Sequence, residues 1–442
     1  MSLLNKTSEI LQKYQLCDYC LGRQFSNLAT GTTNRNRGII IKEFLTMNSV
    51  HKEEDEDLAF LQLISKSGGQ LAKNTLKKKE KVPEATQSCF ICQDKLEFTD
   101  DLIEIIVPAI KNIEAQTFLI GTILPKDFLE REKKLKEEFN LLDSEYLKQE
   151  FNRIIGKKIS EKLPLITDFN SPEIIVESDP ILSKFEIKIK PLYIYGRYLK
   201  FLRTIPQTRW PCRKCKGKGC ELCDGTGKRY QESVEELIEV EAIKTAEAIK
   251  GVLHGAGRED IDARMLGTGR PFVFEIISPK IRTIELEKLQ KSINRFAKGK
   301  IEVKDLRWSS KDELRNLKGS AETTVKKYIA KILFDKQIDL DTLTQIEEIF
   351  ENQEIKQRTP HRVEHRRADK IREKKIFSVK CIQLNDFEIE ATIVCDGGCY
   401  VKELISGDEG RTDPSISKVA GIQAICKELD VIEVRKESTN AE

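Results

Sequence analysis

Residues 254–270 read HGAGREDIDARMLGTGR and gather carboxylates, arginines and glycines in one short stretch. A helix is predicted before it at 231–253, and Pro271 opens a predicted strand at 272–278, so the stretch is expected to be a loop. A phosphate cradle is one interpretation, but the acidic groups would repel phosphate and no G-x-G-x-x-G follows a strand here. A plain turn is another. The third is a catalytic loop, with Asp260 and Asp262 as its candidate carboxylates.

The second half of the chain alternates helical and strand patterns around this loop. Helices are expected at 284–297 and 339–351, and strands at 300–308, at 322–334 and, as two or three strands, within 377–404. This order predicts an α+β fold, in which a mixed and largely antiparallel sheet carries flanking helices.

The first half of the chain also mixes helical and strand patterns, but these surround cysteine pairs and long charged runs. Its predicted elements are helices at 36–47 and 99–113, a charged helical stretch at 126–163, and strands at 116–124, 173–177 and 185–195. A boundary is expected near residue 200, because the following thirty or so residues are loop-like and rich in Cys, Gly, Lys and Arg. The chain is therefore divided into an α/β domain at 1–200 and a second domain at 201–442.

Composition excludes several classes of protein. The 442 residues are 39% hydrophobic and 33% charged, which is typical of a globular protein with two or three domains and too apolar for a disordered one. No run of roughly 18 apolar residues occurs, and the N-terminus lacks the apolar core of an export signal, so we expect no membrane span and a cytoplasmic protein. The net charge of +3 does not by itself indicate a nucleic-acid partner.

Eight of the twelve cysteines form four Cys-x-x-Cys pairs. A two-residue gap lets both sulfurs reach one tetrahedral ion at about 2.3 Å, and two such pairs make a closed structural zinc site. The expected ligand sets are Cys17, Cys20, Cys89 and Cys92, and Cys212, Cys215, Cys220 and Cys223. Chance pairs of reduced buried cysteines are the alternative. The second set lies in a twofold C-x-x-C-x-G-x-G repeat, whose glycines permit turns that bring backbone N–H groups towards thiolates.

Two segments concentrate positive charge. Residues 209–229, which contain the second cysteine set, carry seven Lys/Arg against two acidic residues, and residues 356–375 carry nine against three. Arginine forks fit phosphate geometry, and such clustering favours RNA binding through counterion release, although a solvated helix face is the alternative for 356–375. The predicted RNA-binding residues are Arg209, Arg362, Arg366, Arg367 and Arg411. Trp210 either stacks on a base or packs against the cysteine-rich finger.

Three motifs in chain order resemble those of pseudouridine synthases. G-R-E-D at 257–260 resembles the G-R-T/L-D signature, Lys326-x-Tyr328 resembles the K-x-Y strand, and GGCYVKELI at 397–405 resembles the G-x-Y-[IV]-[RK]-x-L strand. GRYLKFLRTIPQTRWPC at 196–212, SVEEL, and ISGDEGRTDPSIS at 405–417 are similar to a narrower group. That group is the archaeal and eukaryotic tRNA pseudouridine synthases that modify uridines 54 and 55 of the T loop.

This resemblance implies specific roles. Asp260 would be the nucleophile, Tyr328 would stack on the target base, and Lys402 would pair with Asp260, with Arg258 and Arg264 as further candidate cations. Tyr400 would also contact substrate. The N-terminal cysteine pairs would bind zinc in a THUMP-related accessory domain, and 201–442 would be the catalytic domain with a finger inserted at about 209–229. The implied partner is the tRNA T arm, bound by a monomer without an organic cofactor.

The chemistry of the reaction agrees with these residues. Isomerisation of uridine breaks an N-glycosidic bond and forms a C–C bond without redox change, so a carboxylate suffices as nucleophile and the base must be flipped into a pocket. Two alternatives are a THUMP-bearing tRNA enzyme of another chemistry and a non-catalytic zinc-dependent tRNA-binding protein. Open at this point are the choice between uridines 54 and 55, attack on sugar or base, and the ligand pairing within the finger.

Overall fold

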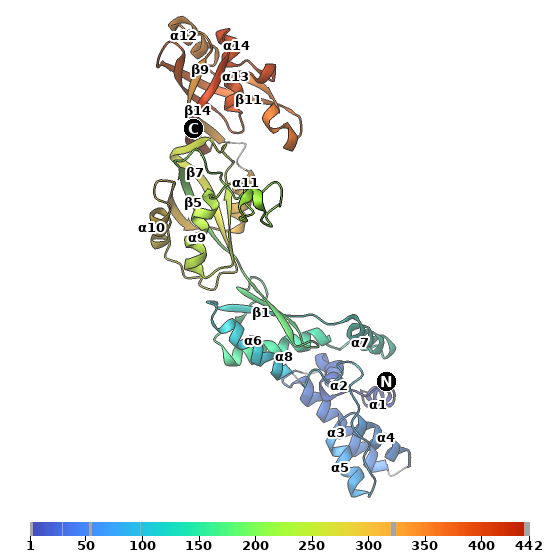
Figure 1. The fold of residues 1–442 in the computed structure, drawn as a ribbon. Coiled ribbons are helices and arrows are strands. Elements are labelled where there is room, and N and C mark those ends of the chain that lie inside the picture. The colour runs from blue at the N-terminus through green and yellow to red at the C-terminus, as the bar shows by residue number, and fades with distance from the viewer. Residues whose placement is uncertain (1–2, 29, 53–54, 98, 320–323, 437–442) are drawn as a thin grey trace, which may run out of the picture. The chain divides into compact units, whose positions relative to one another are not determined.

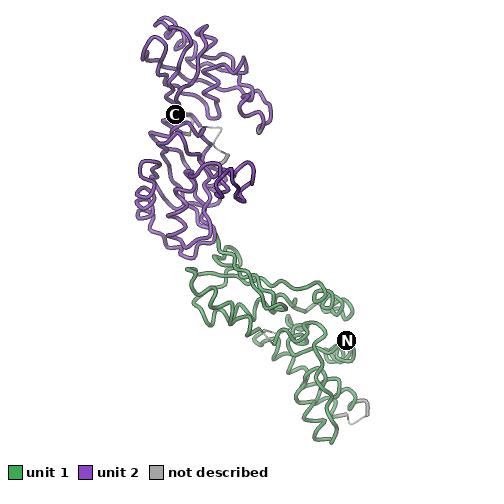
Figure 2. The backbone as a smooth tube through the Cα atoms, in the orientation of Figure 1, with its two compact units in different colours: residues 1–190 green, residues 191–442 purple. Residues whose placement is uncertain are grey.

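The computed structural model describes residues 3–28, 30–52, 55–97, 99–319 and 324–436, and it divides into two compact units. Unit 1 is Met1–Lys190 and unit 2 is Pro191–Glu442, each with its own hydrophobic core (Figure 2). The division precedes the expected position near residue 200, because the strand at 192–200 pairs with strands of unit 2. No helix of the described residues is long and apolar enough to cross a membrane.

Unit 1 begins with a helical part and ends with a small sheet (Figure 1). Its helices are α1 (Leu3–Lys13), α2 (Asp18–Gly22), η1 (Arg23–Leu28), α3 (Asn34–Lys52), α4 (Asp55–Lys66), α5 (Gln70–Lys78), α6 (Thr99–Lys111), α7 (Lys126–Glu138) and α8 (Leu147–Lys162). Its strands are β1 (Thr117–Thr122), β2 (Ile166–Thr167), β3 (Ile174–Asp179) and β4 (Lys184–Ile189), in the order β2-β1-β3-β4. Helix α8 packs on β1, which pairs in parallel with β2 and β3.

Unit 2 is built on one ten-stranded sheet flanked by helices. The strands are β5 (Leu192–Lys200), β6 (Lys250–Gly255), β7 (Ala263–Ile277), β8 (Ile301–Trp308), β9 (Thr324–Phe334), β10 (Gln353–Arg358), β11 (Ile371–Gln383), β12 (Glu388–Asp396), β13 (Thr412–Asp413) and β14 (Ala424–Lys436). Their order is β13-β10-β11-β12-β9-β14-β7-β5-β8, with β6 on β7. Among the described strand pairs of this sheet, β14 with β7 is the parallel one, so the sheet is mixed and largely antiparallel as predicted.

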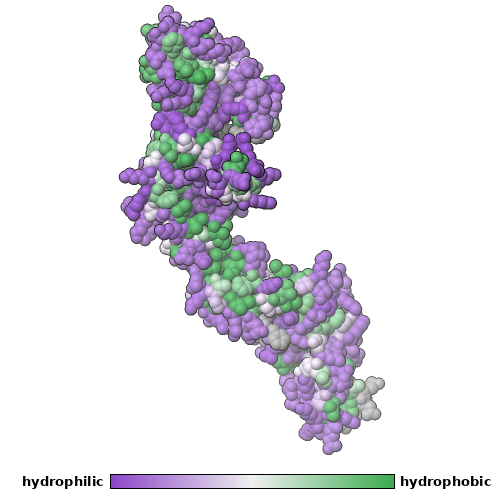
Figure 3. Space-filling view, viewed as in Figure 1, coloured by the Kyte–Doolittle hydropathy of each residue, from purple (hydrophilic) through white to green (hydrophobic). Residues whose placement is uncertain are grey.

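The helices of unit 2 lie against both halves of this sheet (Figure 1). They are η2 (Glu221–Cys223), α9 (Val234–Ala246), α10 (Leu286–Phe296), α11 (Lys311–Gly319), α12 (Leu340–Ile349), η4 (His361–Arg366), α13 (Val401–Ser406), η5 (Asp408–Gly410) and α14 (Ile416–Ala420). Strict alternation explains a strand such as β12, whose sequence EIEATIVCD buries every second side chain. Hydrophilic side chains cover most of the visible face, with scattered hydrophobic ones (Figure 3).

The structure corrects several predicted elements. The helix predicted at 231–253 ends at Ala246, where Glu247 takes a left-handed conformation, and residues 250–255 form β6 instead. Strand β7 begins at Ala263 and not at 272, since its first part pairs with β14. The stretches 126–163 and 185–195 each contain two elements. The end of the predicted 377–404 strand region is helix α13, and 356–375 is two strands and a short turn of helix, not a continuous helix.

Candidate active site

The acidic loop connects the last residue of β6, Gly255, to the first residue of β7, Ala263. Gly257 has a φ of +82°, a conformation that glycine adopts without strain. A Cβ added there would lie 3.1 Å from Nη1 of Arg270, so the close approach of this side chain also favours glycine. The loop is thus a tight connection between two paired strands, and its side chains separate into a buried side and an open side.

The buried side is anchored by Glu259. Its carboxylate oxygens both lie 2.8 Å from the hydroxyl of Tyr198, which donates to them, and Nε of Arg270 donates to one of them at 2.7 Å. Nη1 of Arg270 also donates to the carbonyl of Ala256 at 2.7 Å. All three side chains are almost wholly buried, and burial raises the pKa of Tyr198 well above its usual value. A buried ion pair with this many hydrogen bonds holds the loop in one conformation.

Two further side chains hold the loop backbone. Gln207 donates to the carbonyl of Gly257 at 3.0 Å and to the hydroxyl of Tyr198 at 2.8 Å. The ammonium group of Lys200 lies 2.9 Å from the carbonyl of Ile261 and 3.3 Å from that of Asp260. Burial lowers the pKa of Lys200 to about 8. These two side chains therefore hold the carbonyls of Gly257, Asp260 and Ile261 in place.

The open side presents two carboxylates with different partners. Both oxygens of Asp260 lie 3.0 Å from Nη1 of Arg362, and the Nζ of Lys402 is 3.7 Å away. Lys402 is closer to Asp262, at 2.6 Å. Partial burial raises the pKa of Asp262, but the hydrogen bond and charge of Lys402 outweigh it and bring that pKa below its usual value. The side chain of Asp260 is 33% exposed and that of Asp262 is 64% exposed, so Asp260 is the inner one.

A cavity of about 530 Å³ opens at Asp260. Tyr328 lines it from β9, and Leu429 and Val431 add apolar surface from β14. Tyr328 is 8% exposed, and burial raises its pKa well above the usual value. A carboxylate beside an aromatic ring and an apolar wall suits a flipped base.

The structure brings most of the predicted site residues to this cavity. Asp260 and its expected companions Arg258, Tyr328, Tyr400 and Lys402 all line it. The lining also includes Arg362 and Arg367, which the sequence analysis assigned to RNA, and Arg367 donates to the hydroxyl of Tyr400 at 3.2 Å.

Three predicted arginines lie elsewhere. Arg264 donates to a carboxylate oxygen of Asp430 at 2.9 Å, away from Asp260. Arg209 contacts the carboxylates of Glu236 and Glu239 on α9, at 3.1 and 2.7 Å. Arg411 donates to Nε2 of His361 at 2.9 Å and to the carbonyl of Thr359 at 2.8 Å, so it supports the β10–β11 loop. The side chain of Arg366 lies outside the described part of the structure.

A second hollow, of about 700 Å³, lies beside β5 and β8 and is larger than the cavity at Asp260. Two of its cations are already engaged: Arg197 donates to the carbonyl of Thr268 at 2.6 Å, and Arg307 donates to Glu313 at 2.9 Å. Because it lacks the motif residues, we place the candidate active site at the smaller cavity.

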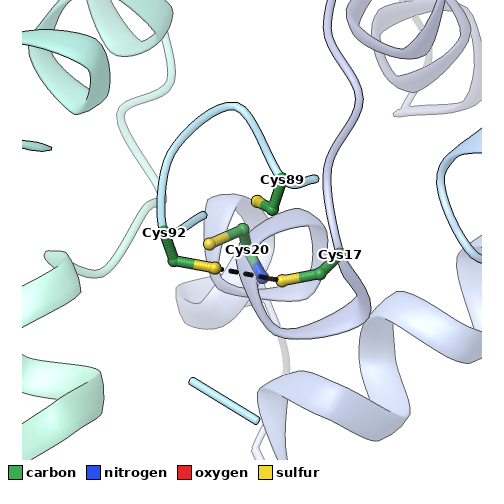
Figure 4. A group of neighbouring side chains, drawn as sticks. All are labelled: Cys17, Cys20, Cys89 and Cys92. Atoms are coloured by element: carbon green, nitrogen blue, oxygen red, sulfur yellow. Dashed lines mark hydrogen bonds between the residues drawn. The ribbon is translucent and has the colours of Figure 1, made fainter. Parts of the chain in front are cut away.

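The first cysteine set forms one cluster in the core of unit 1 (Figure 4). The ligand atoms of Cys17, Cys20, Cys89 and Cys92 all lie within 4.8 Å of one another. Cys17 precedes α2 and Cys20 lies in its first turns, while Cys89 and Cys92 come from the segment before α6. Four thiolates on one zinc ion lie about 3.8 Å apart when each bond is about 2.3 Å, so this group fits a tetrahedral metal ion.

The second set forms a similar cluster in the finger. The sulfurs of Cys212 and Cys220 are 3.8 Å apart, as are those of Cys215 and Cys223, and all four lie within 4.8 Å of one another. The backbone N–H of Gly219 donates to Cys215 Sγ, and that of Gly227 donates to Cys223 Sγ, each at 3.2 Å. The expected approach of backbone N–H groups to the sulfurs is thus confirmed.

The base of the finger contacts the catalytic loop. The backbone N–H of Arg229 donates to the carbonyl of Trp210 at 2.9 Å, which closes the finger. The Trp210 ring lies 5.3 Å from the guanidinium carbon of Arg229 and 4.8 Å from that of Arg258. Trp210 therefore packs between two arginines and also lines the cavity.

Sequence reasoning missed the buried side of the site. The sequence assigns no role to Tyr198, Lys200, Gln207 or Glu259, although Glu259 stands next to the predicted nucleophile. Arg270 was a candidate partner of Asp262, but its Nε donates to Glu259. The adjacency of Glu259 to Asp260 was the available signal, since consecutive loop residues point in opposite directions.

Comparisons with known proteins identify the family. Residues 193–435 match the family "Pus10, C-terminal", and residues 102–179 match "Pus10 THUMP domain, archaeal". The tRNA pseudouridine synthase Pus10 of Methanopyrus kandleri is 40% identical over 98% of this chain and 98% of its own length. That of Methanothrix thermoacetophila is 41% identical over 98% of this chain and 94% of its own.

A solved crystal structure of a Cbf5–Nop10–Gar1 complex shares 16% identity with this chain over 46% of each, at a TM-score of 0.28. The high coverage of the relatives settles the enzyme class against the two alternatives left open by the sequence. The chain belongs to the Pus10 family and is a tRNA pseudouridine synthase.

Proposed function

We propose that this enzyme isomerises uridine 54, uridine 55 or both in the tRNA T loop, with Asp260 as the nucleophile. The observation that carries the proposal is the position of the Asp260 carboxylate, which faces the cavity beside Tyr328 and lies 3.0 Å from a guanidinium and 3.7 Å from an ammonium group. Asp262 is two residues away but lies at the rim, where it pairs with Lys402.

The chain supplies each element of the reaction from its own residues. The flipped uridine enters the cavity, where its base stacks on Tyr328 and meets the apolar side chains of Leu429 and Val431. One oxygen of Asp260 attacks the nucleoside, at the sugar or at the base, and the glycosidic C–N bond breaks. The uracil ring then reattaches to the sugar through a ring carbon, which gives up its proton, while the ring nitrogen that left the sugar takes up a proton, and Asp260 is released unchanged. No atom is gained or lost, so no organic cofactor is consumed.

We propose the T arm of tRNA as the partner, with surface cations as its phosphate contacts. The finger contributes Arg213, Lys214 and Lys218, which are all exposed. Arg209 is paired with Glu236 and Glu239, and Arg411 with Glu364. A phosphate that contacts either arginine would therefore meet a charge that is already partly neutralised. A monomer acting in the cytoplasm stays a prediction.

The two cysteine clusters are proposed to hold structural zinc. Four thiolates in a closed tetrahedral set leave no open position for substrate, so each ion would stabilise its fold and not take part in chemistry. We expect metal analysis of purified protein to find about two zinc ions per chain, since each ion takes four thiolates. A count near zero in protein that remains folded contradicts the proposal.

Pseudouridine mapping tests the position of the modification. Unmodified tRNA transcript is incubated with the protein and no small molecule, then treated with carbodiimide and read by primer extension. We expect reverse-transcription stops that report pseudouridine at position 54, at position 55 or at both, and no stop elsewhere. A transcript with both T-loop uridines replaced by cytidine is the control. Modification confined to another arm of the tRNA contradicts the proposal.

A further inference from the structure

Arg362 reaches the candidate active site from the loop between β10 and β11. The neck of this loop is closed, because the hydroxyl of Thr359 donates to the carbonyl of Ala368 at 2.8 Å and Arg358 is paired with Asp369 at 2.9 Å. Val363, the residue after Arg362, is 3% exposed. The backbone at Arg362 is thus held both by the closed neck of the loop and by the buried side chain of Val363, and Arg362 is not part of a flexible extension.

The guanidinium of Arg362 is shared between two carboxylates on different elements. Its Nε donates to Oε1 of Glu403 at 2.6 Å, and Nη2 lies 3.4 Å from Oε2. Its Nη1 lies 3.0 Å from both oxygens of Asp260. Because the guanidinium is planar and rigid, a carboxylate bound along one edge fixes the direction in which the remaining nitrogen points. Glu403 therefore aims Nη1 at Asp260.

Because Glu403 is more deeply buried than Asp260, the ion pair of Arg362 with Glu403 is the more costly of its two ion pairs to break. The side chain of Glu403 is 6% exposed, on helix α13 next to Lys402, whereas that of Asp260 is 33% exposed. Withdrawal of Arg362 to a phosphate would leave Glu403 as a buried charge without this partner, which is strongly unfavourable. Despite partial desolvation, the hydrogen bond to Glu403 and the charge of Asp260 raise the pKa of Arg362 above its usual value.

Lys402 is less well placed to be the cation of Asp260. Its Nζ lies 3.7 Å from Asp260 but 2.6 Å from Asp262. The residue that the family motif pairs with the nucleophile is thus bound mainly to the neighbouring carboxylate, and the shorter contact with Asp260 comes from Arg362.

We propose that Arg362 is a catalytic residue that binds and orients the carboxylate of Asp260, and that Glu403 is the positioning residue that aims Arg362. The proposal rests on Asp260 being the nucleophile. A guanidinium held on Asp260 selects one orientation of the carboxylate and stabilises its negative charge until the nucleoside is attacked. The basic segment 356–375 then contributes to the chemistry of the site as well as to the binding of RNA.

Single-turnover kinetics with saturating enzyme separate these roles. We expect Arg362→Ala to slow pseudouridine formation by about 100-fold, as for the loss of one charge-stabilising donor. The dissociation constant for tRNA should stay within about twofold of the wild-type value, because the substitution removes at most one exposed contact with a phosphate. Arg362→Lys should recover part of the rate, and millimolar guanidinium should recover part of the rate of Arg362→Ala.

Glu403→Gln keeps the shape of the side chain but weakens its hold on Arg362, so we expect a rate loss of about tenfold with tRNA affinity unchanged. The matched control is Arg295→Ala, which removes the same charge from the exposed face of α10, outside the cavity, and should not alter the rate.

Two results would overturn the proposal. One is an unchanged single-turnover rate for Arg362→Ala with weaker binding and a shallower salt dependence, which would make Arg362 a phosphate contact. The other is a rate loss that neither lysine nor guanidinium relieves. Asp260→Asn is measured in parallel: if that variant stays active, the nucleophile assignment fails, whatever Arg362 does.

Discussion

The two sides of the catalytic loop carry similar charged groups in opposite settings. On the buried side, Glu259 and Arg270 form an ion pair whose side chains are 1% and 2% exposed. On the open side, Asp260 and Asp262 face cations at a cavity. A buried pair that loses one partner leaves an uncompensated charge, whereas an exposed pair contributes little to stability. The comparison predicts that the buried side determines the stability of the loop conformation, and that the open side determines the catalytic activity.

The largest expected effect on stability is at Glu259. Glu259→Gln leaves Arg270 buried without its counter-charge, so we expect the free energy of unfolding to fall by about 3–5 kcal/mol. Urea denaturation measures this change in the free energy of unfolding. Glu302→Gln, on the exposed face of β8, is the control and should change stability by no more than about 0.5 kcal/mol. Equal stability of the two variants would show that the buried pair does not anchor the loop.

A smaller effect on stability is expected at Lys326, which is buried on β9 and lines the cavity. Burial, followed by the charge of Arg270, lowers its pKa from 10.5 to about 8. Between those values the unfolded chain holds a proton that the folded chain has released, so stability rises with pH through this window. Relative to Lys326→Met, the wild type should gain about 2–3 kcal/mol between pH 8 and pH 10.5. Parallel pH dependence of the two proteins would contradict this placement of Lys326.

The smallest effect is expected on the open side, at Asp262. Its partner is Lys402, and the pair is partly exposed, so its loss should lower the free energy of unfolding by about 1 kcal/mol or less. Asp262→Asn should still form pseudouridine in single-turnover assays, and its urea midpoint should lie only slightly below that of the wild type. An inactive Asp262→Asn would shift the catalytic role to the rim carboxylate.

Side chains that lie close together in the sequence, or that belong to a recognised motif, could be predicted to share a site. The Cys-x-x-Cys pairs predicted both cysteine clusters, because a knuckle of this length already brings two sulfurs together. The motif residues Asp260, Tyr328 and Lys402 line one cavity because β7 and β9 both pair with β14, and α13, which carries Lys402, packs against β14.

Groups that depend on tertiary packing could not be predicted in this way. Arg362 contacts Asp260 across 102 positions of the chain, and nothing in a run of arginines marks the one that turns inward. The segment Val401–Ser406 was expected in a strand and contains the β-branched Val401 and Ile405, yet it forms a helix, which Lys402, Glu403 and Leu404 also favour. The early start of β7 was hidden by Gly267 and Gly269, both of which have positive φ inside the strand.

The central claim is that Asp260 is the nucleophile, and Asp260→Asn tests it most directly. Asparagine keeps the shape of the side chain but lacks the ionised oxygen, so we predict no detectable pseudouridine in T-loop RNA under single-turnover conditions. Binding of tRNA should be nearly unchanged, and Asp262→Asn, which removes the same charge from the same loop, should remain active. Substantial pseudouridine formation by folded Asp260→Asn protein would contradict the assignment.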